Sequence, residues 1–356
     1  MEIGIVGLPN VGKSTIFNAL TSGHAAASNY PFTTIEPNVG VVAVPDRRLG
    51  RLFELLKPKK ATPATVRFVD IAGLVKGAAA GEGLGNKFLA HIREVDAVMM
   101  LVRLFEDPNV AHPMGSVDPR RDVEVVETEL LLADLASLER QVDKLSAKAK
   151  SGEKAPKQAL ATLELIKKGL EEGKPVRRLG LKAQDYEEFF FLTAKPVLFV
   201  GNAGEQPEPR PVAALEALAC ERGAACVRLC GKLEAELAEL SAEDRAGFMR
   251  ELGLSQTGLE RVILAAYELL GRCVFFTGNE NEVRAWTLAR GSKAPQAAGA
   301  VHSDFEKGFI KADVYSFEDI DKHLKESALR EKGLIRSEGK EYVVEDGDVI
   351  LFKFSS

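Results

Sequence analysis

The sequence predicts an α/β fold that contains a helical insertion and is followed by a smaller α+β module. Three observations support this prediction. Short β-rich runs alternate with glycine turns and amphipathic helices in the first third of the chain, and a regular leucine spacing begins after Pro119. About the last 80 residues return to β-rich runs separated by turn residues. A chain of 356 residues is long enough for two or three such domains.

The α/β domain is expected to be a mostly parallel sheet wrapped by helices, built from residues 1–120 and 195–273. Apolar runs that end near a turn or a charge predict strands at 3–6, 66–70, 97–102, 197–202 and 226–229. Helices are expected at 14–21 and 211–222.

The insertion, residues 121–194, is predicted to be an antiparallel helical coiled coil. The four-three spacing typical of a coiled-coil seam is formed by Leu131, Leu135, Leu138, Val142 and Leu145. Beyond breakers at Gly152 and Pro156, a second apolar stripe consists of Leu160, Leu163, Ile166 and Leu170. Two interpretations remain open here: a solvated hairpin that stabilises only itself, and an arm that binds a partner.

The C-terminal module, residues 274–356, is expected to combine strands with a helix. Strand-like runs occupy 282–288, 309–316 and 348–354, and the helix is expected at 317–325. Asp346 and Gly347 supply a turn signal. Either an RNA-facing groove or a solvated face is expected for the basic residues Arg284, Arg290, Lys293, Lys307 and Lys311.

The composition excludes several classes of protein. A hydrophobic content of 46%, a charged content of 28% and a net charge of −5 are ordinary for globular chains and do not indicate a general nucleic-acid binder. Apolar stretches fall short of the roughly 20 residues that cross a bilayer, and the acidic N-terminus does not resemble a signal peptide. The four cysteines form no C-x-x-C pair, which argues against a zinc site or a disulfide framework. We expect a cytoplasmic protein with no membrane partner.

The most specific motif is GLPNVGKS, which matches G-x-x-x-x-G-K-[ST] between a predicted strand and a predicted helix. Gly7 and Gly12 allow backbone N–H groups to converge on phosphates, Lys13 supplies a positive charge, and the Ser14 hydroxyl is suited to bind Mg²⁺. The residues expected to bind nucleotide in this loop are Asn10, Val11, Gly12, Lys13, Ser14 and Thr15.

Two further segments complete the expected phosphate site. The sequence Asp70-Ile71-Ala72-Gly73 follows an apolar run, where phosphoryl-transfer sites place an acid near Mg²⁺ and a glycine N–H near the γ-phosphate. Thr34 lies in the loop PFTTIEP, whose hydroxyls are expected to reach the same ion. The predicted metal ligands are therefore Ser14, Thr34 and Asp70, while Lys13 and Gly73 are assigned to catalysis.

The sequence resembles the YchF family, the Obg-like ATPases of the translation-factor class of P-loop GTPases. The resemblance covers essentially the whole chain, and it rests on GLPNVGKST, NYPFTTIEPNVG, VDIAGLVKGAAAGEGLGNKFL, GSVDPRRDVEVVETELLLADL and RAWTLARGSKAPQAAGAVHSDFEKGFIKADV. It implies a G domain with a coiled-coil insertion and a C-terminal TGS module of β-grasp fold. It also implies hydrolysis of ATP in preference to GTP and association with ribosomes, for which we expect large-subunit contacts and leave RNA contacts open.

The base-binding segments favour adenine over guanine. Guanine-specific members of the fold carry N-K-x-D, whereas this chain has Asn202, Ala203, Gly204 and Glu205 there. Ala203 lacks the lysine stem that would cover the base, and Glu205 is one methylene longer than aspartate, so donors on guanine would lose their acceptors. Asn202 and Ala203 are expected to contact the purine, together with the backbone of Gly231. A GTPase that tolerates Glu205 remains the alternative.

The group that positions the attacking water is less defined. Leu74 occupies the place where many GTPases have a glutamine, and an aliphatic side chain cannot orient water. His112 is the candidate catalytic side chain, against the alternative that it only packs. A potassium ion at Asn10 or a residue from a partner would be the alternative group that positions the water. A nucleotide-gated binding switch with slow hydrolysis therefore also remains open.

Overall fold

The computed structural model describes residues 1–22, 38–71, 84–149 and 154–355, and the chain divides into two compact units. Unit 1 comprises Met1–Val41 and Arg67–Leu269, and unit 2 comprises Val42–Val66 and Leu270–Ser356. The sequence analysis assigned 42–66 to the first domain. The structure groups this segment with the C-terminal residues instead, because strand β3 (Lys60–Thr62) pairs in parallel with β9 (Glu282–Ala289).

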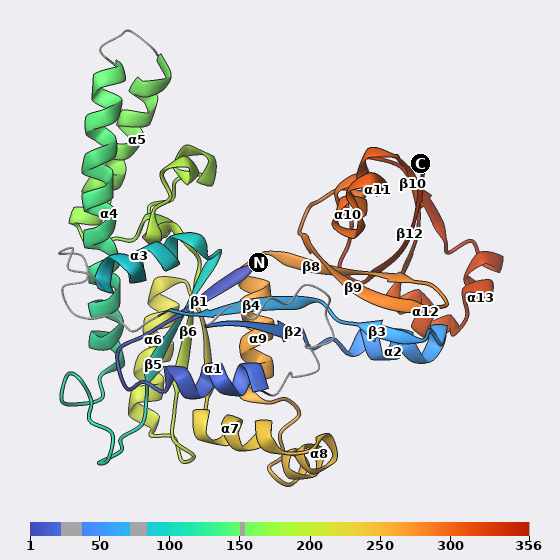
Figure 1. Cartoon of the computed structure of the whole chain (residues 1–356), viewed down its shortest axis with the longest axis horizontal. Helices are drawn as coiled ribbons and strands as arrows, with labels where there is room; N and C mark the ends of the chain where they lie inside the picture. The colour runs from blue at the N-terminus through green and yellow to red at the C-terminus, as the bar shows by residue number, and fades with distance from the viewer. Residues whose placement is uncertain (23–37, 72–83, 150–153, 356) are drawn as a thin grey trace. The chain divides into compact units, whose positions relative to one another are not determined.

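Unit 1 is built on a six-stranded sheet (Figure 1). Its order is β2 (Val39–Ala43), β4 (Thr65–Asp70), β1 (Glu2–Val6), β5 (Ala97–Arg103), β6 (Val197–Asn202) and β7 (Ala225–Leu229). The pairs β4–β1, β1–β5, β5–β6 and β6–β7 are parallel. Every residue of β5 and β6 is buried, which explains why both segments are almost continuously apolar. The predicted α/β class is confirmed.

The strand order indicates where a ligand would bind unit 1. The chain leaves β1 between two neighbours, β4 and β5, that come later in the sequence. Ligands of open α/β sheets bind beyond the carboxyl ends of the strands at such a reversal of strand order. The loop 7–12, which carries the glycine-rich motif, begins at this edge and leads into α1 (Lys13–Ser22).

Further helices of unit 1 surround the sheet. They are α3 (Leu84–Glu94), α4 (Pro119–Ala149), α5 (Lys154–Glu171), α6 (Pro209–Arg222), α7 (Gly231–Glu239), α8 (Ala242–Glu251) and α9 (Gly258–Leu269). Short 3-10 turns η3 (Val176–Arg178), η4 (Ala183–Asp185), η5 (Glu187–Phe189) and η6 (Leu192–Ala194) join α5 to β6.

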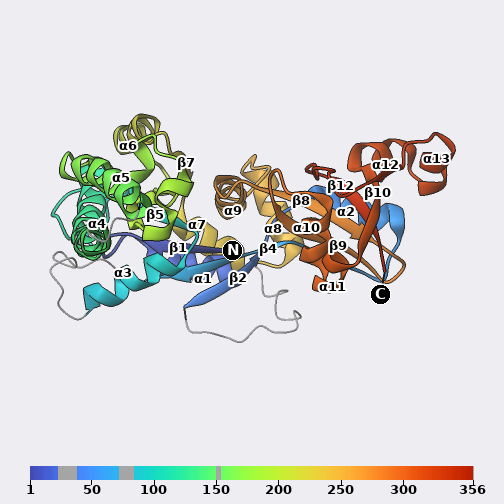
Figure 2. The same cartoon turned by 90° about the horizontal axis from the view of Figure 1, so that it is seen from above.

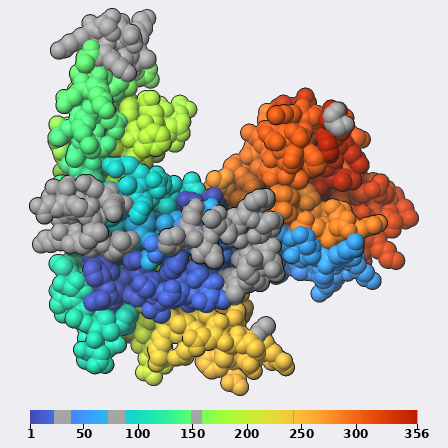
Figure 3. Space-filling view, in the orientation of Figure 1, coloured from blue at the N-terminus to red at the C-terminus, as the bar shows by residue number. Residues whose placement is uncertain are grey.

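Helices α4 and α5 occupy the region predicted to be a hairpin, and they lie side by side in two views (Figures 1 and 2). Leu138, Leu163 and Ile166 are fully buried between them. In the space-filling view the pair projects from the rest of unit 1 (Figure 3). Over the described ranges, no helix is both long and apolar enough to span a membrane.

A buried carboxylate on α4 anchors the segment that leads from the helical pair back to the sheet. Asp134 of α4 is 1% exposed and accepts hydrogen bonds from the backbone N–H groups of Leu192 and Thr193, both at 2.8 Å. Burial raises the pKa of this carboxyl group, and the hydrogen bonds oppose that effect. The segment that returns from the hairpin to β6 is therefore fixed against α4.

Unit 2 contains a second six-stranded sheet. Its order is β11 (Arg336–Glu338), β10 (Phe309–Ser316), β12 (Asp348–Phe354), β8 (Arg272–Gly278), β9 and β3. Five helices accompany it: α2 (Arg47–Leu56), α10 (Ala294–Val301), α11 (Ser303–Lys307), α12 (Phe317–His323) and α13 (Glu326–Glu331).

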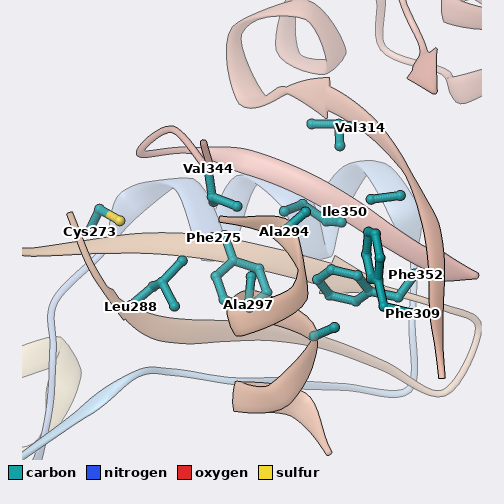
Figure 4. Close-up of a cluster of buried hydrophobic side chains, with 12 residues drawn as sticks. Cys273, Phe275, Leu288, Ala294, Ala297, Phe309, Val314, Val344, Ile350 and Phe352 are labelled. Carbon is teal, nitrogen blue, oxygen red and sulfur yellow. The ribbon is translucent and has the colours of Figure 1, made fainter. Parts of the chain in front are cut away.

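One hydrophobic cluster forms the core between this sheet and α10 (Figure 4). The ring of Phe275 packs edge-on against Phe352, with ring centroids 6.0 Å apart, and Ala294 and Ala297 approach from α10. The small alanine side chains let the helix lie close to the sheet. The predicted α+β character of this module is confirmed, and it also includes the earlier segment with α2 and β3.

Candidate functional site

The glycine-rich loop has a backbone that requires glycine at two positions. A Cβ at Gly7 would lie 2.7 Å from the carbonyl oxygen of Leu101, and Gly12 has a φ of +92°. A Cβ at Gly12 would also lie 2.3 Å from Nδ2 of Asn202. Asn10 adopts a φ of 62°, a left-handed conformation that asparagine tolerates better than most residues. The motif therefore forms a tight loop whose backbone can approach a ligand closely.

Lys13 and Asp70 meet at the end of this loop. The Lys13 ammonium forms an ion pair and a hydrogen bond with Oδ1 of Asp70, and both side chains are largely buried. Lys13 begins α1, while Asp70 ends β4, the neighbour of β1. The structure thus brings together two of the predicted phosphate-site and metal-site residues.

The residues near Lys13 suit a magnesium ion. Ser14 and Thr15 are exposed at the start of α1, and Asp70 supplies a carboxylate, so hard oxygen donors are available. Among the described residues, no group of three or more His, Cys, Asp or Glu side chains forms a metal cluster. The donor set therefore fits an ion held jointly by a hydroxyl, a carboxylate and phosphate oxygens. Thr34, Gly73 and Leu74 lie outside the described residues.

A cavity of about 680 Å³ adjoins the loop. Asn10, Gly12 and Thr15 line one side of it. The predicted base-binding residues Asn202, Ala203 and Gly231 also line it, and so do their neighbours Gly204, Glu205, Cys230 and Lys232. Segments almost 200 residues apart in the sequence therefore share one cavity, as expected for a site that holds both the phosphates and the base of a nucleotide.

Asn202 links the two sides of this cavity. Its Nδ2 donates to the carbonyl oxygen of Val11 at 2.9 Å, and its Oδ1 accepts from the backbone N–H of Gly231 at 2.9 Å. The residue is 5% exposed. An asparagine amide has two N–H donors and two acceptor lone pairs, so one of each remains for a ligand. The structure therefore gives Asn202 a clamping role that sequence reasoning missed, and its contact with a purine stays a prediction.

Helix α7, which begins at Gly231, is fixed by Glu234. This buried carboxylate accepts hydrogen bonds from the backbone N–H groups of Gly258 at 2.6 Å and Leu259 at 3.2 Å, at the start of α9. Burial raises the pKa of Glu234, and the two backbone hydrogen bonds act in the opposite direction. The loop that closes the cavity is thus supported by a second buried anchor.

Arg103, at the end of β5, is a residue that sequence reasoning missed. It is 2% exposed, its Nε donates to the carbonyl oxygen of Phe105 at 2.9 Å, and its guanidinium lies 4.4 Å from the centroid of the Phe105 ring. Its NH1 approaches the carbonyl oxygen of Asn10 at 3.4 Å. The sequence did contain a signal for Arg103, because a charged residue directly follows the apolar run AVMMLV. Arg103 stabilises the loop that carries Phe105, which lines the cavity.

His112 lies in the segment between β5 and α4 and lines a neighbouring cavity of about 280 Å³, which shares Glu106, Asp107 and Val110 with the first cavity. Its side chain is 4% exposed, and its Nε2 lies 2.9 Å from Oδ2 of Asp122. Its Nδ1 accepts a hydrogen bond from the backbone N–H of Met114 at 3.1 Å. Both ring nitrogens are therefore occupied in this conformation, which favours the packing alternative for this state. The catalytic role of His112 stays a prediction, and it requires one of these two hydrogen bonds to break.

The preceding residue ties this segment to the glycine-rich loop. Nδ2 of Asn10 donates to the carbonyl oxygen of Ala111 at 3.0 Å. The side chain predicted as a candidate potassium ligand thus holds the His112 segment beside the loop, and a potassium role stays a prediction.

The basic residues of the C-terminal module belong to unit 2 and are partly committed to contacts within it. Arg284 stacks on the ring of Trp286 at 4.1 Å, and Lys293 pairs with Glu341. Lys311 lies 3.8 Å from Asp313. These contacts support the expected solvated face, and an RNA-facing groove stays a prediction.

Gly12 offers a direct test of the loop geometry. Replacing Gly12 with alanine should destabilise the nucleotide-free protein by about 2–4 kcal/mol, because the backbone is left-handed and the new methyl group would clash with Asn202. The matched control is Gly50→Ala in α2, where a Cβ meets open space and a helical alanine should stabilise by about 0.5–1 kcal/mol. Urea unfolding measures both variants. Equal stability of Gly12→Ala and the wild type would contradict the described loop.

Comparison with known proteins points to one family. Residues 2–130 match the family described as 50S ribosome-binding GTPase, and residues 273–355 match the YchF GTPase C-terminal family, described as a protein of unknown function. The ribosome-binding ATPase YchF of Bacillus subtilis (strain 168) is 47% identical over 363 residues, which cover 100% of this chain and 99% of the relative. The same-named protein of Escherichia coli O157:H7 is 50% identical over 359 residues and covers 99% of both chains.

A solved structure agrees with these relatives. The YchF GTPase of Schizosaccharomyces pombe matches with a TM-score of 0.88 and 36% identity, covering 99% of this chain and 97% of the other. With relatives this similar along its full length, the chain belongs to the YchF family.

Proposed function

We propose that the protein is a magnesium-dependent nucleoside triphosphate hydrolase that prefers ATP to GTP and acts as a nucleotide-gated regulator on ribosomes. The observation that carries the proposal is the cavity beside the glycine-rich loop, which is lined by Asn202, Ala203 and Glu205 in place of a guanine-selective set. The curated relatives are named as ribosome-binding ATPases, which supports both parts of the proposal.

The residues present suit phosphoryl transfer to water. Lys13 would release Asp70 and bind the terminal phosphates, where its charge stabilises the transition state. Ser14 and Asp70 would hold Mg²⁺, which when bound neutralises charge that develops on the phosphate oxygens. Thr34 and Gly73 are proposed to complete the site on the basis of their motifs. His112 is proposed to orient the attacking water.

The charges at the mouth of the cavity also favour adenine. The carboxylate of Glu205 pairs with Lys232 at 2.7 Å, so it is already engaged by a cation. Both side chains are exposed, and such a pair is weak, but it draws the carboxylate toward the start of α7. Ala203 is 4% exposed and offers no stem to cover a base. The N1 and N2 donors of guanine would therefore have to compete with Lys232 for this carboxylate.

Competition between the two nucleotides tests the base preference. ATP should displace a fluorescent ATP analogue at a concentration no higher than GTP requires. The double variant Ala203→Lys with Glu205→Asp should shift the preference toward GTP, by about tenfold for each restored bidentate contact of roughly 1–3 kcal/mol. A wild-type protein that strongly prefers GTP would contradict the proposed substrate.

Ribosome association is supported by family membership and by elements that hydrolysis does not require. The helical pair α4–α5 projects from unit 1 (Figure 3), and we propose that it is a coiled-coil arm for a partner. Unit 2 is proposed to be a TGS module of β-grasp fold, and contacts with the large subunit or its RNA are proposed for these two elements. A ribosomal role agrees with the expected cytoplasmic location.

A binding switch with slow hydrolysis is the second candidate. Leu74 favours it, because an aliphatic side chain cannot orient water, and so does the engaged state of both nitrogens of His112. Turnover measured with and without ribosomes separates the two: a switch hydrolyses slowly in both cases.

A further inference from the structure

The surroundings of His112 define its protonation state. The backbone N–H of Met114 donates to Nδ1, so that nitrogen carries a lone pair and no proton. Nε2 then carries the proton and donates it to Oδ2 of Asp122 at 2.9 Å. The two partners thus match the Nε2-protonated tautomer of the imidazole.

The two hydrogen bonds differ in how readily they can break. The bond to Asp122 has an ionised acceptor, and the two side chains are 4% and 3% exposed. Charge-assisted hydrogen bonds are roughly twice as strong as neutral ones, and leaving a buried carboxylate without a donor is costly. The bond to Met114 is a longer, neutral bond in an exposed loop. Freeing a ring nitrogen for catalysis should therefore release Nδ1 and keep Nε2 on Asp122.

Asp122 itself is held firmly. It lies in the first turn of α4, where a negative charge is favoured by the helix dipole. Its second oxygen, Oδ1, accepts from Nε and NH2 of Arg121 at 3.2 and 2.9 Å. Val123 and Val126, on the following turns of α4, are 0% and 1% exposed. Asp122 thus has a fixed position on a rigid element, as required of a group that orients another side chain.

We propose that Asp122 is a positioning residue for ATP hydrolysis, which holds the imidazole of His112 by Nε2 so that Nδ1 is the nitrogen that faces the attacking water. This inference rests on the proposed catalytic role of His112. The hydrogen bond between Asn10 and Ala111 keeps the segment next to the glycine-rich loop, so opening of the Met114 bond needs only a local change.

Steady-state kinetics of Asp122→Asn tests the proposal in the full-length protein. An asparagine has one acceptor oxygen and one N–H2 group, so either Nε2 of His112 or the Arg121 guanidinium faces a donor and loses its acceptor. We expect kcat to fall at least about 10-fold, because loss of a group that orients a functional side chain costs on the order of 10- to 100-fold at metal sites and more in an Asp–His pair, while KM for ATP stays within threefold. An unfolded fraction would also lower the apparent kcat without changing KM, so kcat is expressed per ATP-binding site, titrated with a fluorescent ATP analogue.

Asp118→Ala is the matched control. Asp118 precedes α4 and accepts a hydrogen bond from the backbone N–H of Arg121 at 3.2 Å, but it is exposed and has no contact with His112 among its described hydrogen bonds. The substitution Asp118→Ala weakens the start of the same helix, yet kcat should stay within twofold of the wild type. A loss of kcat in Asp118→Ala equal to that in Asp122→Asn would assign the effect to the helix and overturn the proposal.

A double-mutant cycle distinguishes this inference from the proposed function. If Asp122 acts through His112, the double variant His112→Ala with Asp122→Asn should turn over ATP no more slowly than His112→Ala alone. A slow His112→Ala together with an Asp122→Asn of wild-type kcat would overturn the positioning role and leave His112 catalytic. Wild-type turnover of His112→Ala would overturn both. Histidine ¹⁵N chemical shifts of the wild type should also show the Nε2-protonated tautomer for His112.

Discussion

Replacing Lys13 with alanine is expected to weaken ATP binding by about 100-fold. Lys13 lies at the start of α1 against Asp70, and in the proposed function its ammonium moves from that carboxylate to the terminal phosphates. A hydrogen bond to a charged group is worth roughly 1.5–3 kcal/mol, and each 1.4 kcal/mol changes the dissociation constant tenfold. Isothermal titration calorimetry with ATP and Mg²⁺ measures the effect.

Lys174→Ala provides the control for this experiment. Lys174 lies between α5 and η3 and forms an exposed ion pair with Glu172, with side chains 57% and 44% exposed. Exposed pairs contribute about 0–1 kcal/mol, and this one is unrelated to the cavity, so the ATP dissociation constant should not change. If Lys13→Ala bound ATP as tightly as Lys174→Ala, the assignment of Lys13 to the phosphates would be wrong.

The parallel sheet was predictable because its strands carry local signals. Strand β6 has the bounds expected from the sequence, 197–202, since a continuous apolar run begins directly after Pro196. Helix α1 begins one residue before the predicted start and ends one residue after the predicted end. Each of these elements is buried along most of its length or on one face, and burial is what selects apolar residues at such positions.

The assignment of residues 42–66 to a unit was not predictable in the same way. Strand β3 has three residues, Lys60 and Ala61 are exposed, and its partner β9 lies more than 200 residues further along the chain. Such a strand is defined by backbone hydrogen bonds to a distant segment, which leave no pattern in the sequence of the strand itself. Periodicity and turn signals report only on neighbours in the sequence.

In the candidate site, too, features with a local sequence motif could be predicted, and features that depend on distant contacts could not. The glycine-rich loop is a continuous motif, so Gly12 and Lys13 could be assigned from the order of residues alone. The clamp between Asn202 and Val11 and the pair formed by His112 and Asp122 depend on which loops the fold brings together. Sequence reasoning named Asn202 and His112 but could not supply their partners. It had no signal for Asp122, which is one of several acids at the start of α4.

Replacing His112 with alanine is expected to lower kcat for ATP hydrolysis by about 10²-fold or more, while the ATP dissociation constant changes by only a small factor. Leu74 cannot orient water, and a neutral imidazole with a free Nδ1 can accept a hydrogen bond or a proton from it near neutral pH. Lys13, by contrast, acts on binding, so the two variants should separate affinity from turnover.

The measurement is steady-state hydrolysis at saturating ATP and Mg²⁺ with potassium held constant, and His91→Ala is the control. His91 is an exposed residue of α3, so its loss should leave kcat unchanged. Removing the His112 ring also removes the donor to Asp122, which costs stability, so each variant is compared at a temperature where circular dichroism shows it fully folded. Equal turnover in His112→Ala and His91→Ala would exclude His112 from the reaction, and the water would then have to be positioned by an ion at Asn10 or by a residue from a partner.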